Sequence, residues 1–120
     1  MSTVERISGN HVAMEDGEVA SVGANLRVEE DVRFEVEGSV GGNVDVREGA
    51  DLYVGGKIGG NLTAAADTLV TVEGNVGGNV RTEGEMTLNG KVGGNVAVYG
   101  DGDVDVDEGR VGGNVRYHDA

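Results

Sequence analysis

The chain of 120 residues contains no cysteine, no proline and no tryptophan, and only one Phe and three Tyr. Without cysteine, a disulfide scaffold, thiolate catalysis and cysteine-ligated metal sites are excluded. Basic residues are also scarce: nine Lys and Arg stand against 22 Asp and Glu, a formal net charge of −13. That charge argues against nucleic-acid binding through phosphate contacts and against direct attachment to anionic membranes.

Long apolar runs are missing as well. No segment approaches the roughly 18 apolar residues of a membrane span, and no charged-then-apolar signal peptide opens the chain. By length the chain is one domain. We therefore expect a cytoplasmic protein that comes near the membrane only through partners.

What the chain does have is glycine, 23 residues in all, and the glycines are periodic. The string Gly-x-(Val/Ile)-Gly-Gly-Asn-(Val/Leu) occurs five times, and a weaker copy starts at Ala20. From that copy on, successive starts are 18, 18, 18, 16 and 19 residues apart. A degenerate trace, Ile7-Ser8-Gly9-Asn10, indicates one further turn. The five full copies start at Gly38, Gly56, Gly74, Gly90 and Gly109.

The period of 18 divides into three steps of six, and apolar residues also alternate with polar ones within each step. Residues at i and i+2 share one face of a strand, so this pattern predicts short strands with an aliphatic interior. Thr82 is the one polar residue at the six-residue spacing. The stepped positions are Val22, Val28, Phe34, Val40, Val46, Leu52, Ile58, Ala64, Val70, Val76, Thr82 and Leu88.

Three short strands per repeat predict an all-β, single-domain fold, a triangular β-solenoid of about six rungs of ~18 residues. Residues 1–19 are expected to form an N-terminal segment with a partial or degenerate rung, and residues 20–120 the solenoid itself. The 16-residue repeat loses two residues near Glu83 to Asn89, and the 19-residue repeat gains one near Asp107-Glu108. Both changes are expected at corners, where insertions are tolerated.

The Gly-Gly-Asn element predicts a sharp corner, because Gly and Asn accept a positive φ at least cost. One Asn per rung would then form a row along the rod, in which stacked amides hydrogen-bond as in Asn ladders. A ligand site is the alternative, but a site usually breaks the symmetry that this row keeps. The predicted row consists of Asn25, Asn43, Asn61, Asn79, Asn95 and Asn114.

The repeated V-x-G-N-V motif on a short Val- and Gly-rich chain resembles the bactofilins, over about Ala20 to Tyr117. The resemblance implies a right-handed triangular β-helix that polymerises end to end into non-polar filaments without nucleotide. It implies a scaffold for cell shape and protein localisation, with other cytoskeletal or membrane-associated proteins as possible partners. The acidic composition is similar to that of the haloarchaeal homologues called halofilins. Bactofilins place an aromatic near the C-terminal end in their polymer contact, a role that Tyr117 can fill.

End-to-end stacking also follows in part from the residues. A solenoid exposes unpaired N–H and C=O groups and a slice of core at each end unless a cap covers them. Only three residues follow the expected last strand, too few for a cap. We expect the C-terminal contact to use Val111, Val115 and Tyr117, and the N-terminal contact to use Ile7, Val12, Met14 and Val19.

Asp101, Asp103, Asp105 and Asp107 alternate with Gly and Val. This pattern favours a solvated acidic face, while a Ca²⁺ site is the alternative that oxygen-rich clusters allow. The glycine and distal glutamate of an EF-hand loop are missing. Because neighbouring like charges repel, we expect a halophilic protein that loses its fold or its assembly in low salt.

Enzyme functions have little support. A left-handed hexapeptide-repeat enzyme fits the step of six, and periodicity does not reveal handedness. The carbonic anhydrases of that class need three metal-binding His, and this chain has only His11 and His118. We expect no catalytic activity and no cofactor. The main alternative to a filament protein is a non-polymerising adaptor that binds a partner on one flat face.

Overall fold

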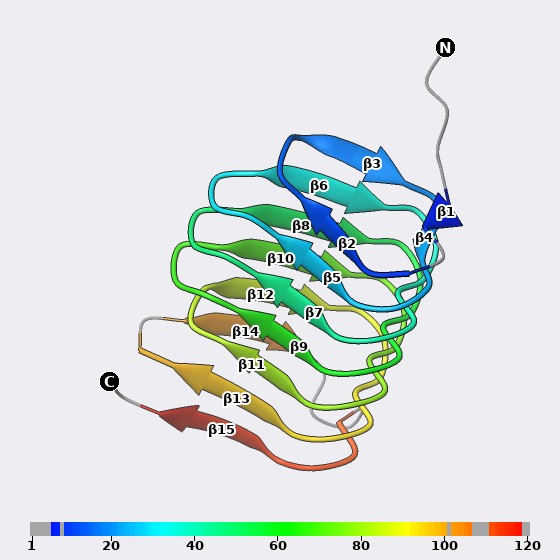
Figure 1. Ribbon diagram of the computed structural model, residues 1–120. Coiled ribbons are helices and arrows are strands. Elements are labelled where there is room, and N and C mark those ends of the chain that lie inside the picture. Colours follow the sequence, from blue (N-terminus) through cyan, green and yellow to red (C-terminus); the bar gives the residue numbers. More distant parts are fainter. Residues whose placement is uncertain (1–5, 8, 101, 107–110, 119–120) are drawn as a thin grey trace.

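The computed structural model describes residues 6–7, 9–100, 102–106 and 111–118, and every regular element in those ranges is a β-strand (Figure 1). The strands are short because each runs along one side of a triangular rung before the chain turns. One side is a parallel seven-stranded sheet. Its strands are β2 (His11–Ala13), β5 (Leu26–Val28), β7 (Val44–Val46), β9 (Leu62–Ala64), β11 (Val80–Thr82), β13 (Val96–Tyr99) and β15 (Val115–His118).

The second side is a parallel six-stranded sheet. Its strands are β3 (Gly17–Val19), β6 (Arg33–Val36), β8 (Asp51–Val54), β10 (Leu69–Val72), β12 (Glu85–Leu88) and β14 (Asp103–Val106). The third side begins with β1 (Arg6–Ile7) paired to β4 (Ser21–Val22) and continues as single bridges. Those bridges join Val22, Val40, Ile58, Val76, Val92 and Val111 in that order.

The predicted β-solenoid of about six turns of ~18 residues is confirmed. In Figure 1 the chain descends while it runs to the left along the nearer, seven-stranded sheet and to the right along the farther, six-stranded sheet. This combination of directions is a right-handed winding. Right-handed crossovers are also the rule between parallel strands. A left-handed hexapeptide fold does not have this winding.

The core is a single column of mostly aliphatic side chains along the axis. Every residue of the six-residue series from Val22 to Leu88 is buried, as the alternation predicted. The polar exception, Thr82, is fully buried, and its hydroxyl forms hydrogen bonds with the nearby backbone. Its hydroxyl accepts a hydrogen bond from the Gly84 N–H at 3.0 Å and lies 3.2 Å from the Gly84 carbonyl oxygen.

The N-terminal segment contributes a strand to all three sides. β1, β2 and β3 pair with β4, β5 and β6. In this rung Ile7, the first residue of the degenerate trace, pairs with Val22, only 15 residues later. The expected degenerate rung is thus a shortened rung with strands on each side.

The short repeat has its deletion at the predicted place. Only two residues, Glu83 and Gly84, separate β11 from β12, whereas four separate β9 from β10. The missing pair belongs to the corner between the two sheets. The expected insertion near Asp107-Glu108 lies outside the described residues.

The predicted positive φ at Gly-Gly-Asn is wrong. Positive φ values occur at the corner between the two sheets instead, at Asp31, Gly49, Asp67 and Gly100. At Gly-Gly-Asn, glycine is required because successive rungs approach closely. A Cβ at Gly59, for example, would lie 2.6 Å from the carbonyl oxygen of Gly41 in the rung before it.

Candidate polymer interfaces at the ends of the rod

The asparagine row is a hydrogen-bonded ladder, but its bonds differ from those expected. Each Oδ1 accepts a hydrogen bond from the backbone N–H of the next asparagine along the rod, at 2.8 to 3.0 Å, whereas amide-to-amide bonds were predicted. The row therefore satisfies corner N–H groups, and it includes one residue that the prediction left out, Asn10. Its members are Asn10, Asn25, Asn43, Asn61, Asn79, Asn95 and Asn114.

Asn61→Ala is expected to lower the free energy of unfolding by about 1 kcal/mol, the usual net value of one hydrogen bond. The substitution removes the acceptor 2.8 Å from the Asn79 N–H, and water can replace it only in part. Chemical denaturation followed by circular dichroism measures the change. Thr63→Ala, at an exposed position of β9 two residues away, is the matched control. Equal stability of the two variants would contradict a structural role for the ladder.

The C-terminal end exposes an aromatic residue at a core position. Tyr117 pairs with Val98, whose side chain points into the core. The pairing continues along the seven-stranded sheet through five more residues, all buried, yet Tyr117 is 65% exposed. Within the described ranges no strand covers the outer edge of β15, so the ring has no neighbour on that side. The buried residues of this column are Ala13, Val28, Val46, Ala64, Thr82 and Val98.

The same end is stepped, because the seven-stranded sheet ends with β15 while the six-stranded sheet ends one rung earlier with β14. Val111 and Val115 pack against the core but are only partly buried, and so is Val106 in β14. The counterparts of Val111 and Val115 in the preceding rung, Val92 and Val96, are fully buried. Within the part of the chain that the structure describes, the last rung is therefore an open slice of apolar core with an unpaired strand edge.

The N-terminal end is hollowed and partly aromatic. The rings of His11 and Phe34 stack across the core, with centroids 5.4 Å apart and planes 30° apart. Gly17 pairs with Phe34 and brings no side chain to cover the ring. The first rung thus borders a shallow, open hollow of about 560 Å³, whose lining includes Ala13 and Val19. From the sequence alone, His11 was considered only as a metal-binding or catalytic residue and was not connected with Phe34.

The predicted N-terminal contact residues do not all lie on the end face. Val19 is buried in the first rung, and Met14 is exposed at the corner after β2. Val12 pairs with Arg27 at an outward-facing position, so it lies on the side of the rod. Ile7 pairs with Val22, and its side chain lies outside the described residues. A single β-strand places successive side chains on opposite faces, which is why Val12 and Ala13 diverge.

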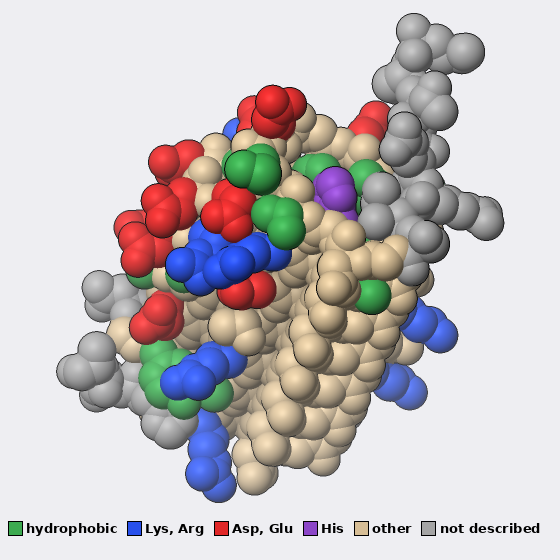
Figure 2. Space-filling model, viewed as in Figure 1, with side chains coloured by type: hydrophobic (Ala, Val, Ile, Leu, Met, Phe, Trp, Pro, Cys, Tyr) green, Lys and Arg blue, Asp and Glu red, His purple; other side chains and the backbone are tan. Residues whose placement is uncertain are grey.

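The acidic strand near the C-terminus has the predicted alternation where it is described. Asp103 and Asp105 are exposed and Val104 is buried, while Asp101 and Asp107 lie outside the described residues. Figure 2 shows acidic side chains gathered along one margin of the rod. In the described part of the chain, no three His, Asp or Glu side chains are grouped so that they could hold a metal ion.

Among the residues that the structure describes, no helical segment has the length and apolar character of a membrane span.

Comparisons of the chain with protein-family models, with curated proteins and with solved structures find no match. Function must therefore be argued from the geometry of the rod.

Proposed function

We propose that the chain is a bactofilin-like cytoskeletal scaffold whose rods stack end to end into filaments without nucleotide, in support of cell shape or protein localisation. The observation that carries this proposal is the exposure of Tyr117 at a position that is core in every other described rung. Large aromatic side chains contribute strongly to interfaces when they are buried there.

The strand edges support the same function. The outer edges of β15 and of the first-rung strands β2 and β3 have no partner strand within the described residues. Unpaired edges are templates for pairing with another chain, and monomeric solenoids commonly cap them. A second rod placed on either end would continue the 4.7–4.9 Å strand spacing and bury the open core slice.

Val115→Glu combined with Tyr117→Glu is expected to abolish filaments and leave a folded monomer. The two carboxylates would lose their hydration at the contact without a partner charge, a cost of several kcal/mol per ion. Negative-stain electron microscopy in molar KCl without nucleotide measures the filaments, and circular dichroism measures the fold.

Tyr53→Glu is the matched control, because Tyr53 is an exposed tyrosine on the side of the rod. This variant should form filaments like the unmodified protein. Normal filaments from the Val115/Tyr117 double variant would exclude end stacking through this face. Unmodified rods that stay monomeric in sedimentation at high concentration and high salt would favour the adaptor alternative.

A further inference from the structure

The outer face of the six-stranded sheet carries an apolar patch midway along the rod. Most outward residues of this sheet are acidic or Thr, but Tyr53 in β8 and Leu69 in the neighbouring β10 are 38% and 46% exposed. The other large apolar side chains that are exposed among the described residues, Val12, Met14 and Tyr117, belong to the first and last rungs. End stacking therefore does not cover Tyr53 and Leu69.

Two hollows meet at Leu69. One, of about 400 Å³, is lined by Leu52, Tyr53 and Thr71, among others. The other, of about 460 Å³, lies where the short rung lacks two corner residues, and Gly84 is in its wall. We call the two hollows together the Leu69 groove.

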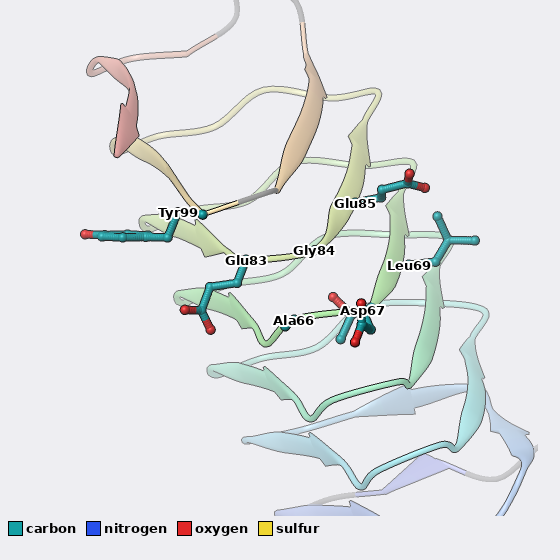
Figure 3. Close-up of a pocket in the computed structure, with 9 residues that line it drawn as sticks. Ala66, Asp67, Leu69, Glu83, Gly84, Glu85 and Tyr99 are labelled. Carbon is teal, nitrogen blue, oxygen red and sulfur yellow. The ribbon is translucent and has the colours of Figure 1, made fainter. Parts of the chain in front are cut away.

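The second hollow exists because the corner that should fill it is missing. Corners at Ala66-Asp67 and Tyr99-Gly100 flank the gap left at Glu83-Gly84. Figure 3 shows Leu69 and Glu85 projecting from neighbouring strands on one side of this hollow, and Glu83 and Tyr99 on the other. The groove thus breaks the rung-to-rung symmetry that the asparagine row keeps.

Carboxylates surround the apolar part of the groove. Arg33 is the basic residue in its lining, and its Nε lies 3.5 Å from Oδ2 of Asp51, so that charge is already compensated. An excess of negative charge remains around Leu69 and raises the local concentration of cations. The acidic residues that line the two hollows are Glu35, Asp51, Asp67, Glu83 and Glu85.

We propose that the Leu69 groove docks an extended segment of another protein that carries aliphatic side chains next to Lys or Arg. An apolar centre with a charged rim is the usual anatomy of a protein interface, and the charge of the rim selects a basic partner. A second copy laid side by side is disfavoured in the groove, because the outward residues around it are mostly acidic or Thr, whereas the end of the rod presents apolar core residues. The proposal does not rest on filament formation, since the groove is open on a single rod.

The test uses a fluorescein-labelled octapeptide of alternating Leu and Lys as the probe, with fluorescence anisotropy as the readout. Saturable binding to the unmodified protein is expected. Leu69→Ser should weaken it by about tenfold, the loss typical of one apolar anchor. Val12→Ser, which removes an equally exposed side chain from the other sheet, should leave binding unchanged. Neither substitution changes the net charge, and circular dichroism verifies that both variants fold.

A peptide with Ser in place of Leu separates charge from apolar contact. Equal binding of the two peptides, or equal affinity of Leu69→Ser and unmodified protein, would mean that only the acidic surface attracts the probe and would overturn the proposal. Side-by-side association of unmodified rods that Leu69→Ser abolishes would instead assign the groove to a second copy. Electron microscopy of Leu69→Ser should still show filaments. A loss of peptide binding in this variant is therefore distinguishable from a loss of end stacking.

Discussion

Gly77→Ala is expected to destabilise the rod by about 3 kcal/mol, near the upper end for overpacked interiors, and to lower the melting temperature by roughly 10 °C. A Cβ at Gly77 would lie 2.6 Å from the carbonyl oxygen of Gly59 one rung earlier. Neither backbone can yield, because the Gly77 N–H is bonded to the Ile58 oxygen and the Gly59 N–H to the Val40 oxygen, both at 2.8 Å. Gly77 has no positive φ, so the loss of stability would come from the close approach of the two rungs and not from backbone strain.

Gly78 provides the matched comparison. A Cβ at Gly78 would meet first the Oδ1 of Asn61, a side-chain atom, although the Gly60 backbone is also close at 2.9 Å. Asn61→Ala should therefore rescue part of the cost of Gly78→Ala, by about 1 kcal/mol, and none of the cost of Gly77→Ala. Urea unfolding of the three single and two double variants gives both coupling energies. A Gly77→Ala variant within about 0.5 kcal/mol of the unmodified protein would refute the close-approach argument.

The interior of the rod could be predicted from the sequence because strand alternation is a local property. Val44, Asp45 and Val46 show the pattern, since the two valines are buried and the aspartate between them faces outward. Thr82 follows the same rule although Thr is polar, because its position in the repeat determines the direction of its side chain. The deletion at Glu83-Gly84 was equally visible as a shortened interval.

Contacts between rungs were harder to predict, because they depend on residues 15 to 19 positions away. The glycines of Gly-Gly-Asn suggested an unusual φ, yet they are needed because Gly59 and Gly60 face the Gly41 oxygen and the Asn43 side chain. The hydrogen bond of each asparagine goes to a backbone N–H, which no residue pattern distinguishes from an amide partner.

The contact residues at the two ends of the rod were also only partly predictable from the sequence. Tyr117 was predicted as a contact residue, and its pairing with Val98 places it at a core position. Val12 was predicted as a contact residue only because it is apolar. Its pairing with Arg27 places its side chain on the outer side of the rod. The hollow over Phe34 depends on Gly17 lying one strand away, a neighbour that the linear sequence does not reveal.

Lowering KCl from 2 M to 10 mM is expected to reduce the melting temperature by roughly 10 °C and to dissolve filaments. Outward carboxylates lie on adjacent rungs, as Glu85 does beside Asp103. At a strand spacing of ~4.8 Å, each such pair costs about 0.9 kcal/mol in water when it is unscreened. The screening length falls from ~30 Å at 0.01 M to below ~3 Å at 2 M salt. Thermal circular dichroism and sedimentation measure fold and assembly separately.

Ion pairs offer little compensation for this repulsion. Those in the described ranges join atoms 3.3 to 3.9 Å apart, with side chains 36 to 81% exposed, so each contributes little. Asp103→Asn with Asp105→Asn removes two outward carboxylates without touching the core and should flatten the salt dependence. If the melting temperature of this variant changes with KCl as steeply as that of the unmodified protein, the salt effect comes from apolar burial, which salts also strengthen. A melting temperature and sedimentation profile that do not change with KCl would show that the net charge of −13 neither weakens the fold nor keeps rods apart.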